Sequence, residues 1–255
     1  ASLWPAAGDS LGAVWLDGRR YAPAPDGGEP TKEMMLLSAL LGPDGTVGLE
    51  HRLDERICDC CQTGLALTAR GPVVVYRDRT AGEIRDVSIV RRVDGAWTAP
   101  APVHADGWRI EACPVNGPAV AAEGERVAVA WFTGARDTAK VNVAFSDDAG
   151  ASFSAPVRVD GGAPAGRVDV ELAAGGGALV SWLERIGGDT AEVRVRHVAA
   201  GGAPGEPRTV ARSGAARASG FPRMVRAGGR VVFAWTVPGE PTRVEVAAAP
   251  LEGGR

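Results

Sequence analysis

The stretch RVAVAWFTGAR, Arg126–Arg136, decides the fold of this chain. Its apolar run ends in an aromatic residue, Trp131, and a polar loop follows. A turn of small and polar residues, AEGE, stands directly before the run. Consecutive apolar positions of this kind are typical of a strand that is buried on both faces between neighbouring layers. We therefore expect a central strand here, packed between two sheets.

The same pattern occurs five times along the chain. The aromatic residues that mark it lie 51 to 61 residues apart and are Trp15, Tyr76, Trp131, Trp182 and Trp235. Most units also carry an apolar segment before the turn, an alternating segment after the aromatic residue, and a fourth segment that contains proline. Four strands in roughly 50 residues, repeated, predict the radial sheets of a β-propeller. A β-sandwich would explain the strands but not the regular period.

We therefore predict an all-β fold, a β-propeller of four-stranded antiparallel blades, with residues 1–255 forming a single domain. About five blades are visible in the pattern. The first unit lacks a convincing innermost strand, and the last lacks a full fourth strand. Six blades are the alternative, with a shared or missing N-terminal part.

Composition narrows the range of partners. The chain has 255 residues, a net charge of −3 and no run rich in Lys and Arg, so nucleic acid is not expected as a binding partner. No apolar stretch approaches the ~18–20 residues of a membrane helix, so the chain is not expected to span a membrane. No signal peptide is visible in this chain. We expect a monomer whose 35 glycines and 18 prolines serve tight turns between short strands.

The segment SDDAGASF, Ser146–Phe153, fits the Asp-box pattern S-x-D-x-G-x-x-[W/F]. The residues that match are Ser146, Asp148, Gly150 and Phe153, in a turn expected between the third and fourth strands of a blade. With the repeat, this resembles the sialidase-like, or BNR-repeat, β-propellers. The stretches DGWRIEACPVNGPA and CDCC further resemble a bacterial subgroup of that superfamily with a CxCC motif. The resemblance implies a periplasmic or secreted protein that binds carbohydrate.

The chemistry of true sialidases does not carry over residue by residue. Members of that family hold the substrate carboxylate with three Arg and use a late Tyr as nucleophile, with an early Asp as acid/base. The only tyrosines here are Tyr21 and Tyr76, and no Tyr follows. No catalytic residue can therefore be assigned, and exo-sialidase activity is not expected. Whether the chain is an enzyme stays open, with a glycosidase-type hydrolase as the enzymatic alternative.

Ligands of propellers usually bind at the axis, where loops from several blades meet. The candidate ligand-binding residues are Arg77, Asp78, Arg79, Asn116, Asp169, Glu171 and Arg223. An Arg there could bind a carboxylate or phosphate with two parallel hydrogen bonds. We therefore expect an exported propeller that binds an anionic glycan or a protein partner at the axial mouth. Salt bridges between blades are the alternative role of these charges, and a hydrolase or lyase using axial carboxylates is the alternative function.

Three of the four cysteines lie in ERICDCCQTG, Glu55–Gly64. They are Cys58, Cys60 and Cys61, and the fourth is Cys113. Aligning the repeats on their aromatic residues places Cys58 or Cys60 opposite Cys113, near the axial mouth. Disulfides, with no cofactor, are one interpretation, since an even cysteine count is typical of exported proteins. A Cu or Zn site and a redox-active pair are the others, and they would suit a periplasmic metal-binding or redox protein.

Overall fold

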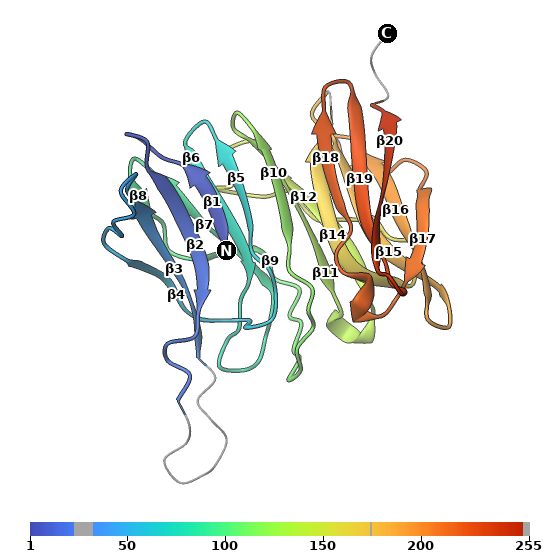
Figure 1. Cartoon of the computed structure of the whole chain (residues 1–255), viewed down its shortest axis with the longest axis horizontal. Coiled ribbons are helices and arrows are strands. Elements are labelled where there is room, and N and C mark those ends of the chain that lie inside the picture. Colours follow the sequence, from blue (N-terminus) through green and yellow to red (C-terminus); the bar gives the residue numbers. More distant parts are fainter. Residues whose placement is uncertain (23–32, 174, 252–255) are drawn as a thin grey trace.

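A computed structural model describes residues 1–22, 33–173 and 175–251. Over these residues the chain forms five antiparallel sheets, each built from strands that follow one another in sequence (Figure 1). The first sheet contains β1 (Ser2–Pro5), β2 (Leu11–Asp17), β3 (Met34–Leu41) and β4 (His51–Ile57). The second contains β5 (Gly64–Thr68), β6 (Gly71–Arg77), β7 (Val87–Val93), β8 (Ala96–Trp97) and β9 (Ala101–His104).

The remaining sheets follow the same plan. The third contains β10 (Ala119–Glu123), β11 (Arg126–Thr133), β12 (Lys140–Ser146) and β13 (Val157–Arg158). The fourth contains β14 (Pro164–Leu172), β15 (Ala178–Gly187), β16 (Thr190–Val198) and β17 (Arg208–Gly214). The fifth contains β18 (Arg223–Ala227), β19 (Arg230–Val237) and β20 (Arg243–Pro250). Two short 3₁₀ helices, η1 (Ala135–Asp137) and η2 (Arg217–Ser219), lie in connecting loops. No helix in the described ranges has the length and apolar character needed to cross a membrane.

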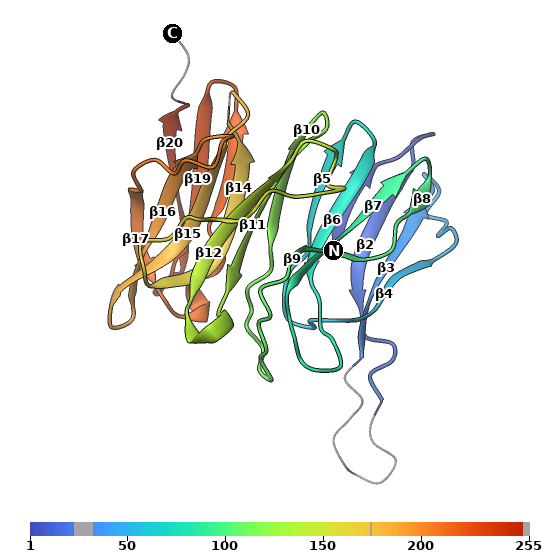
Figure 2. The same cartoon turned by 180° about the vertical axis from the view of Figure 1, so that it is seen from behind.

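The sheets stand side by side in sequence order, and Figure 2 shows the same succession from behind. Their first strands are neighbours, since β5 contacts β1 and β10, and β14 contacts β10 and β18. This is the arrangement of blades in a propeller. All five marker aromatics lie in the second strand of their sheets. The predicted repeat of antiparallel meanders is therefore confirmed.

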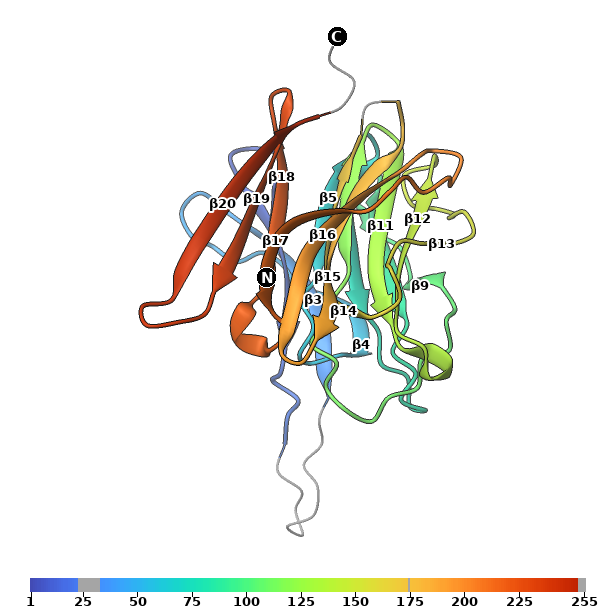
Figure 3. The ribbon, with the colours of Figure 1, turned by 90° about the vertical axis from the view of Figure 1, so that its right-hand side faces the viewer.

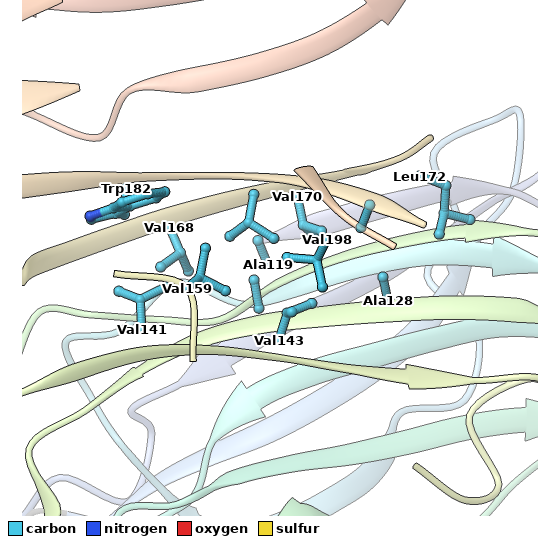
Figure 4. Close-up of a cluster of buried hydrophobic side chains, with 13 residues drawn as sticks. Ala119, Ala128, Val141, Val143, Val159, Val168, Val170, Leu172, Trp182 and Val198 are labelled. Atoms are coloured by element: carbon cyan, nitrogen blue, oxygen red, sulfur yellow. The ribbon is translucent and has the colours of Figure 1, made fainter. Parts of the chain in front are cut away.

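The hydrophobic core is divided into clusters between successive sheets. Figure 4 shows the cluster between the third and fourth sheets, where Trp182 and Val168 face Val141 and Val143. Trp131, at the end of the run that predicted this fold, is fully buried in the cluster between the second and third sheets. Both faces of β11 are covered because a sheet packs on either side of it. A consecutive apolar run is the sequence consequence of that position.

The turn Ser146–Phe153 lies between β12 and β13, the third and fourth strands of its sheet, as predicted. Asp148 accepts hydrogen bonds from the backbone N–H and the hydroxyl of Ser152, at 2.9 and 2.6 Å. The hydroxyl of Ser146 accepts the N–H of Gly150 at 2.8 Å, and Gly150 has a φ of 80°. Phe153 packs against the core between the second and third sheets. Local hydrogen bonds and a positive φ thus fix the turn.

The fifth sheet differs from the others because it has three strands and one largely exposed face. Figure 3 shows this sheet at the left edge of the molecule. Its opposite face packs Met224, Phe233 and Trp235 against the fourth sheet. The exposed face carries Val225 and Val246, which are 53% and 64% exposed.

Candidate functional site

A pocket of about 370 Å³ opens where the loops that enter three first strands come together. One wall is the segment before β10, with Pro114, Val115 and Asn116. The opposite wall is formed by the start of β14 and by the loop around η2, which precedes β18. In Figure 1, η2 is the short turn at the lower end of β18. The hairpin between β15 and β16 closes the side. The pocket is therefore shared by the third, fourth and fifth sheets.

Three arginines line this pocket, namely Arg167, Arg185 and Arg217. Arg167 is only 8% exposed. Its guanidinium donates to the carbonyl oxygens of Gly220 at 3.0 Å and Ala215 at 3.5 Å, and it lies 5.7 Å from the centre of the Phe221 ring. Within the described residues it has no carboxylate partner. Burying a guanidinium without a counter-ion costs free energy, because an opposite charge is needed to compensate fully for the desolvation of its charge.

The other two arginines add to the positive charge. Arg185 and Arg217 are exposed, and neither forms an ion pair with any residue in the described part of the chain. Burial lowers the pKa of Arg167, and the charges of Arg185 and Arg217 lower it further. Asp189 is the single carboxylate that lines the pocket. The pocket thus has a surplus of positive charge that suits an anionic group.

The backbone around the pocket is held in uncommon conformations. Val115 and Arg167 have φ values of 49° and 56°, in the left-handed region that β-branched and long side chains rarely adopt. Asn116 connects them, since its Oδ1 accepts the N–H of Arg167 at 2.8 Å and its Nδ2 donates to the carbonyl of Ala165 at 3.3 Å. A Cβ on Gly166 would lie 2.2 Å from that Oδ1, so only glycine fits there. Such strain is concentrated at functional sites in many proteins.

Of the predicted ligand-binding residues, Asn116 is the one that lines this pocket. Arg77 is 2% exposed and donates to the carbonyl oxygens of Asn116, Arg85 and Phe132 at 2.6–2.8 Å. It also stacks 4.9 Å from the ring centre of Trp108, and burial lowers its pKa. Arg77 is therefore an internal contact between the second and third sheets, made through carbonyl oxygens rather than through the salt bridges of the alternative interpretation.

Asp78 and Arg79 directly follow β6 of the second sheet and lie outside the pocket lining, and Asp78 forms a bridge with Ile57 of the first sheet. Arg79 pairs with Glu83 at 2.9 Å. Asp78 is half-buried, and this burial, together with the charge of Asp54, raises its pKa to about 6. Arg79 belongs to a local network of ion pairs around Glu83, whereas Asp78 accepts the backbone N–H of Arg79 at 2.6 Å.

Asp169, Glu171 and Arg223 connect the fourth and fifth sheets. Asp169 accepts the N–H of Met224 at 2.9 Å and lies 3.3 Å from Nε of Arg223. Burial raises the pKa of Asp169, and burial and the nearby Asp169 raise that of Glu171. None of the three lines the pocket.

One disulfide joins the cysteine cluster to the segment before β10. It links Cys60 to Cys113, which confirms the predicted bridge between these places and selects Cys60 rather than Cys58. Cys113 directly precedes Pro114 of the pocket wall. The second expected disulfide is not formed. Cys58 and Cys61 are both free thiols, and both are buried.

The two thiols lie in contact with each other and with the disulfide. The Sγ atoms of Cys58 and Cys61 are 3.1 Å apart, and Sγ of Cys58 is 3.6 Å from that of Cys60. The hydrogen bond between the two sulfurs, aided by Arg85, lowers the pKa of Cys58 to about 6, whereas the same hydrogen bond and burial raise the pKa of Cys61. The sulfurs of Cys58, Cys60 and Cys61 lie within 4.8 Å of one another, and the copper or zinc site expected as an alternative stays a prediction.

Sequence reasoning did not select Arg167 or Arg217. A weak signal was present, since both follow small-residue segments, GGAPAG and SGAA, that lead into first strands. Asn116 occupies the matching place one repeat earlier. Aligning the third and fourth repeats on Trp131 and Trp182 would have brought Asn116 and Arg167 together, whereas Arg217 lies three positions out of that alignment.

Comparison with known proteins gives the fold. No family model matches the chain, and no curated protein matches it. A protein of unknown function from Dyadobacter fermentans DSM 18053 is 16% identical, with 98% of this chain and 78% of that chain covered and a TM-score of 0.59. A GH43_12 protein retrieved from capybara gut metagenome is 10% identical over 76% of this chain and 40% of that chain, with a TM-score of 0.51. The polysaccharide lyase Uly1 is 9% identical over 98% of this chain and 58% of that chain, with a TM-score of 0.50.

Proposed function

We propose that residues 1–255 form a single, exported β-propeller of the sialidase-like kind that binds an anionic glycan in the pocket lined by Arg167, Arg185 and Arg217. The observation that carries this proposal is the guanidinium of Arg167, buried without a carboxylate partner at the pocket wall. A carboxylate or sulfate of the ligand would supply the missing counter-charge. Arg185 and Arg217 are exposed and able to turn toward the same group.

Carbohydrate is the ligand class to test first for two reasons. The structures that share the fold include a GH43_12 protein and a polysaccharide lyase. The pocket is also wide, polar and open, which suits a hydroxyl-rich ligand with one charged group. Export is supported by the Cys60–Cys113 disulfide, since disulfides persist mainly outside the cytosol.

Binding is a better account of this pocket than hydrolysis. Glycoside hydrolysis by the common mechanism needs a pair of carboxylates flanking the bond that breaks. Asp189 is the one carboxylate in the lining, and Asp169 is engaged by Met224 and Arg223. A glycosidase or lyase activity is therefore an outcome for the test rather than a second proposal.

Isothermal titration with defined oligosaccharides tests the proposal. The probes are oligogalacturonate, a sulfated galactan oligomer and a neutral galactan oligomer of equal length. We expect one of the anionic probes to bind, the neutral one not to bind, and affinity to fall with added salt. In Arg217→Ala and Arg185→Ala the affinity should fall about tenfold or more, as expected for loss of a charge-assisted contact.

Arg243→Ala is the matched control, because Arg243 is an exposed arginine of the fifth sheet that pairs with Glu245, outside the pocket lining. It should leave the affinity unchanged. Equal binding by Arg217→Ala and Arg243→Ala would reject the pocket as the site. Release of reducing or unsaturated sugars during the titration would show that the chain cleaves the probe, and the proposed function would then be catalysis rather than binding.

A further inference from the structure

The four cysteine sulfurs form a continuous path from the surface to the interior. Cys113 is exposed, Cys60 is half-buried, and Cys58 and Cys61 are 1% and 2% exposed. Along this path Cys113 is bonded to Cys60, Cys60 lies 3.6 Å from Cys58, and Cys58 lies 3.1 Å from Cys61. A disulfide and a dithiol therefore touch within one chain.

The surroundings of Cys58 differ from those of an inert buried cysteine. Nη1 of Arg85 lies 3.5 Å from its sulfur, and Arg85 is itself buried. Thiolates form beside positive charges, whereas a cysteine in apolar surroundings stays protonated. The carboxylate of Glu83 lies 2.9 Å from Nη2 of Arg85 and holds the guanidinium in place. Cys58 is thus the sulfur of the group best prepared to act as a nucleophile, and the nearest disulfide sulfur is that of Cys60.

We propose that these residues form a thiol–disulfide exchange centre, in which Cys58 and Cys61 take over the disulfide held by Cys60 and Cys113. The thiolate of Cys58 attacks Sγ of Cys60, and the bond between Cys60 and Cys113 breaks with its electron pair leaving on Cys113. The thiolate of Cys61 then attacks Sγ of Cys58 and displaces Cys60. The two protons released by Cys58 and Cys61 are taken up by Cys60 and Cys113, so no external oxidant or reductant is needed.

The exchange moves one disulfide between a surface position and a buried one. With the disulfide inside, Cys113 is an exposed thiol, able to attack a disulfide carried by a small molecule or a peptide. With the disulfide outside, the same sulfur is the accessible point for attack by an external thiolate. Cys113 is therefore the sulfur that reacts with external thiols and disulfides, and Cys58 and Cys61 are the buried pair that exchanges the disulfide with it. This inference is independent of what the arginine pocket binds.

Mapping the alkylated cysteines tests the proposal. The oxidised protein is quenched in acid, denatured, labelled with N-ethylmaleimide without reductant, and digested with trypsin. Cleavage after Arg56 and Arg109 places Cys58, Cys60 and Cys61 in one peptide and Cys113 in another, so the label on Cys113 reports its state directly. We expect a measurable fraction of chains in which Cys113 and Cys60 are labelled while Cys58 and Cys61 are bridged.

Two variants separate exchange from incomplete oxidation. Cys58→Ser removes the nucleophile and Cys61→Ser removes the resolving thiol, while both keep Cys60 and Cys113. In Cys58→Ser the labelled fraction of Cys113 should fall at least fivefold. In Cys61→Ser the reaction stops after the first step, so the bridge between Cys58 and Cys61 is absent and any chain with labelled Cys113 carries a bridge between Cys58 and Cys60. The melting temperature confirms that each variant is folded. If a variant does not fold, the wild-type map still decides.

Two results overturn the proposal. In one, Cys113 of the wild type is fully protected and stays so after incubation with cystamine and cysteamine. In the other, all four cysteines are labelled without reductant and copper or zinc leaves the protein on denaturation, because four metal-bound thiolates would leave no disulfide to exchange.

Discussion

Oδ1 of Asn116 accepts the backbone N–H of Arg167 at 2.8 Å, and this contact joins the segment before β10 to the first half of strand β14. Nδ2 of Asn116 donates to the carbonyls of Ala165 and Pro114 at 3.3 Å. One buried amide therefore holds both walls of the arginine pocket. It also explains why Arg167 tolerates a φ of 56°, since a hydrogen bond fixes its backbone there.

Replacing this amide should affect stability and binding together. In Asn116→Ala the N–H of Arg167 loses its partner, and an unsatisfied buried group costs about 1–3 kcal/mol. We expect urea unfolding to show a loss of that size and the anionic oligosaccharide to bind more weakly. Asn142→Ala, a change at a buried asparagine of β12 outside the pocket, is the control for binding. Unchanged affinity in Asn116→Ala would mean that the amide does not position Arg167.

Truncation of Arg77 should destabilise the fold strongly, whereas truncation of Arg217 should leave its stability nearly unchanged. Arg77→Met leaves three buried carbonyl groups without their donor, so we expect a loss of about 2–5 kcal/mol in unfolding free energy. Arg217→Ala removes an exposed side chain and relieves repulsion on Arg167, so its effect should lie within about 0.5 kcal/mol of zero. Chemical denaturation of both variants measures this contrast. A large loss in Arg217→Ala would show that Arg217 is also structural.

Asp78 should make the protein more stable as the solution becomes mildly acidic. Burial raises the pKa of Asp78 to about 6 in the folded state, above the value of 3.8 for an unperturbed aspartate. The folded chain then binds a proton more readily than the unfolded chain, so this group's contribution to stability rises as pH falls from above 6 to below 4. Asp78→Asn should therefore stabilise the protein by about 1 kcal/mol at pH 8 and have no such effect at pH 3.5. Equal effects at both pH values would rule out titration of Asp78 as the cause.

Glu83 should make the protein less stable as the solution becomes acidic, the reverse of the effect of Asp78. Its hydrogen bonds with Arg79, and then with Arg85, lower the pKa of Glu83 from 4.5 to about 2. Its stabilising contribution is complete above pH 4.5 and is lost as pH falls toward 2. We expect Glu83→Gln to flatten the acid limb of the stability curve, measured by urea midpoints between pH 2 and pH 6. An unchanged slope would contradict the assignment.

The disulfide should support the pocket as well as the fold. It closes a separation of 53 residues, and loss of such a crosslink costs about 2–4 kcal/mol. Cys113→Ser should lower the melting temperature and, because Cys113 precedes Pro114, weaken binding of the anionic oligosaccharide. Reduction of the wild type should have the same two effects. Binding that survives both treatments would show that the pocket wall is held by Asn116 alone.

The sequence by itself determined the succession of antiparallel meanders. Trp131 and Trp182 each end a run of consecutive apolar residues. The runs are apolar on both faces because other sheets cover each strand on both sides. The same periodicity brought Cys60 and Cys113 to equivalent places on adjacent sheets, so their proximity could be predicted without knowledge of which cysteine pairs. These features are local or repeat every 51 to 61 residues, and a single chain displays them directly.

The tertiary structure alone decided which charges are accessible. Arg77 and Arg167 are both buried arginines, yet the first is saturated by carbonyls from neighbouring segments and the second faces a pocket beside Arg185 and Arg217. Apart from Arg85, which is 8 residues from Arg77, their partners lie on other sheets or the loops that lead into them, 39 to 55 residues away in the chain, and no local pattern records them. The cost of burying a charge depends on those distant partners. For that reason the fold could be predicted from periodicity, while the site required the packed structure.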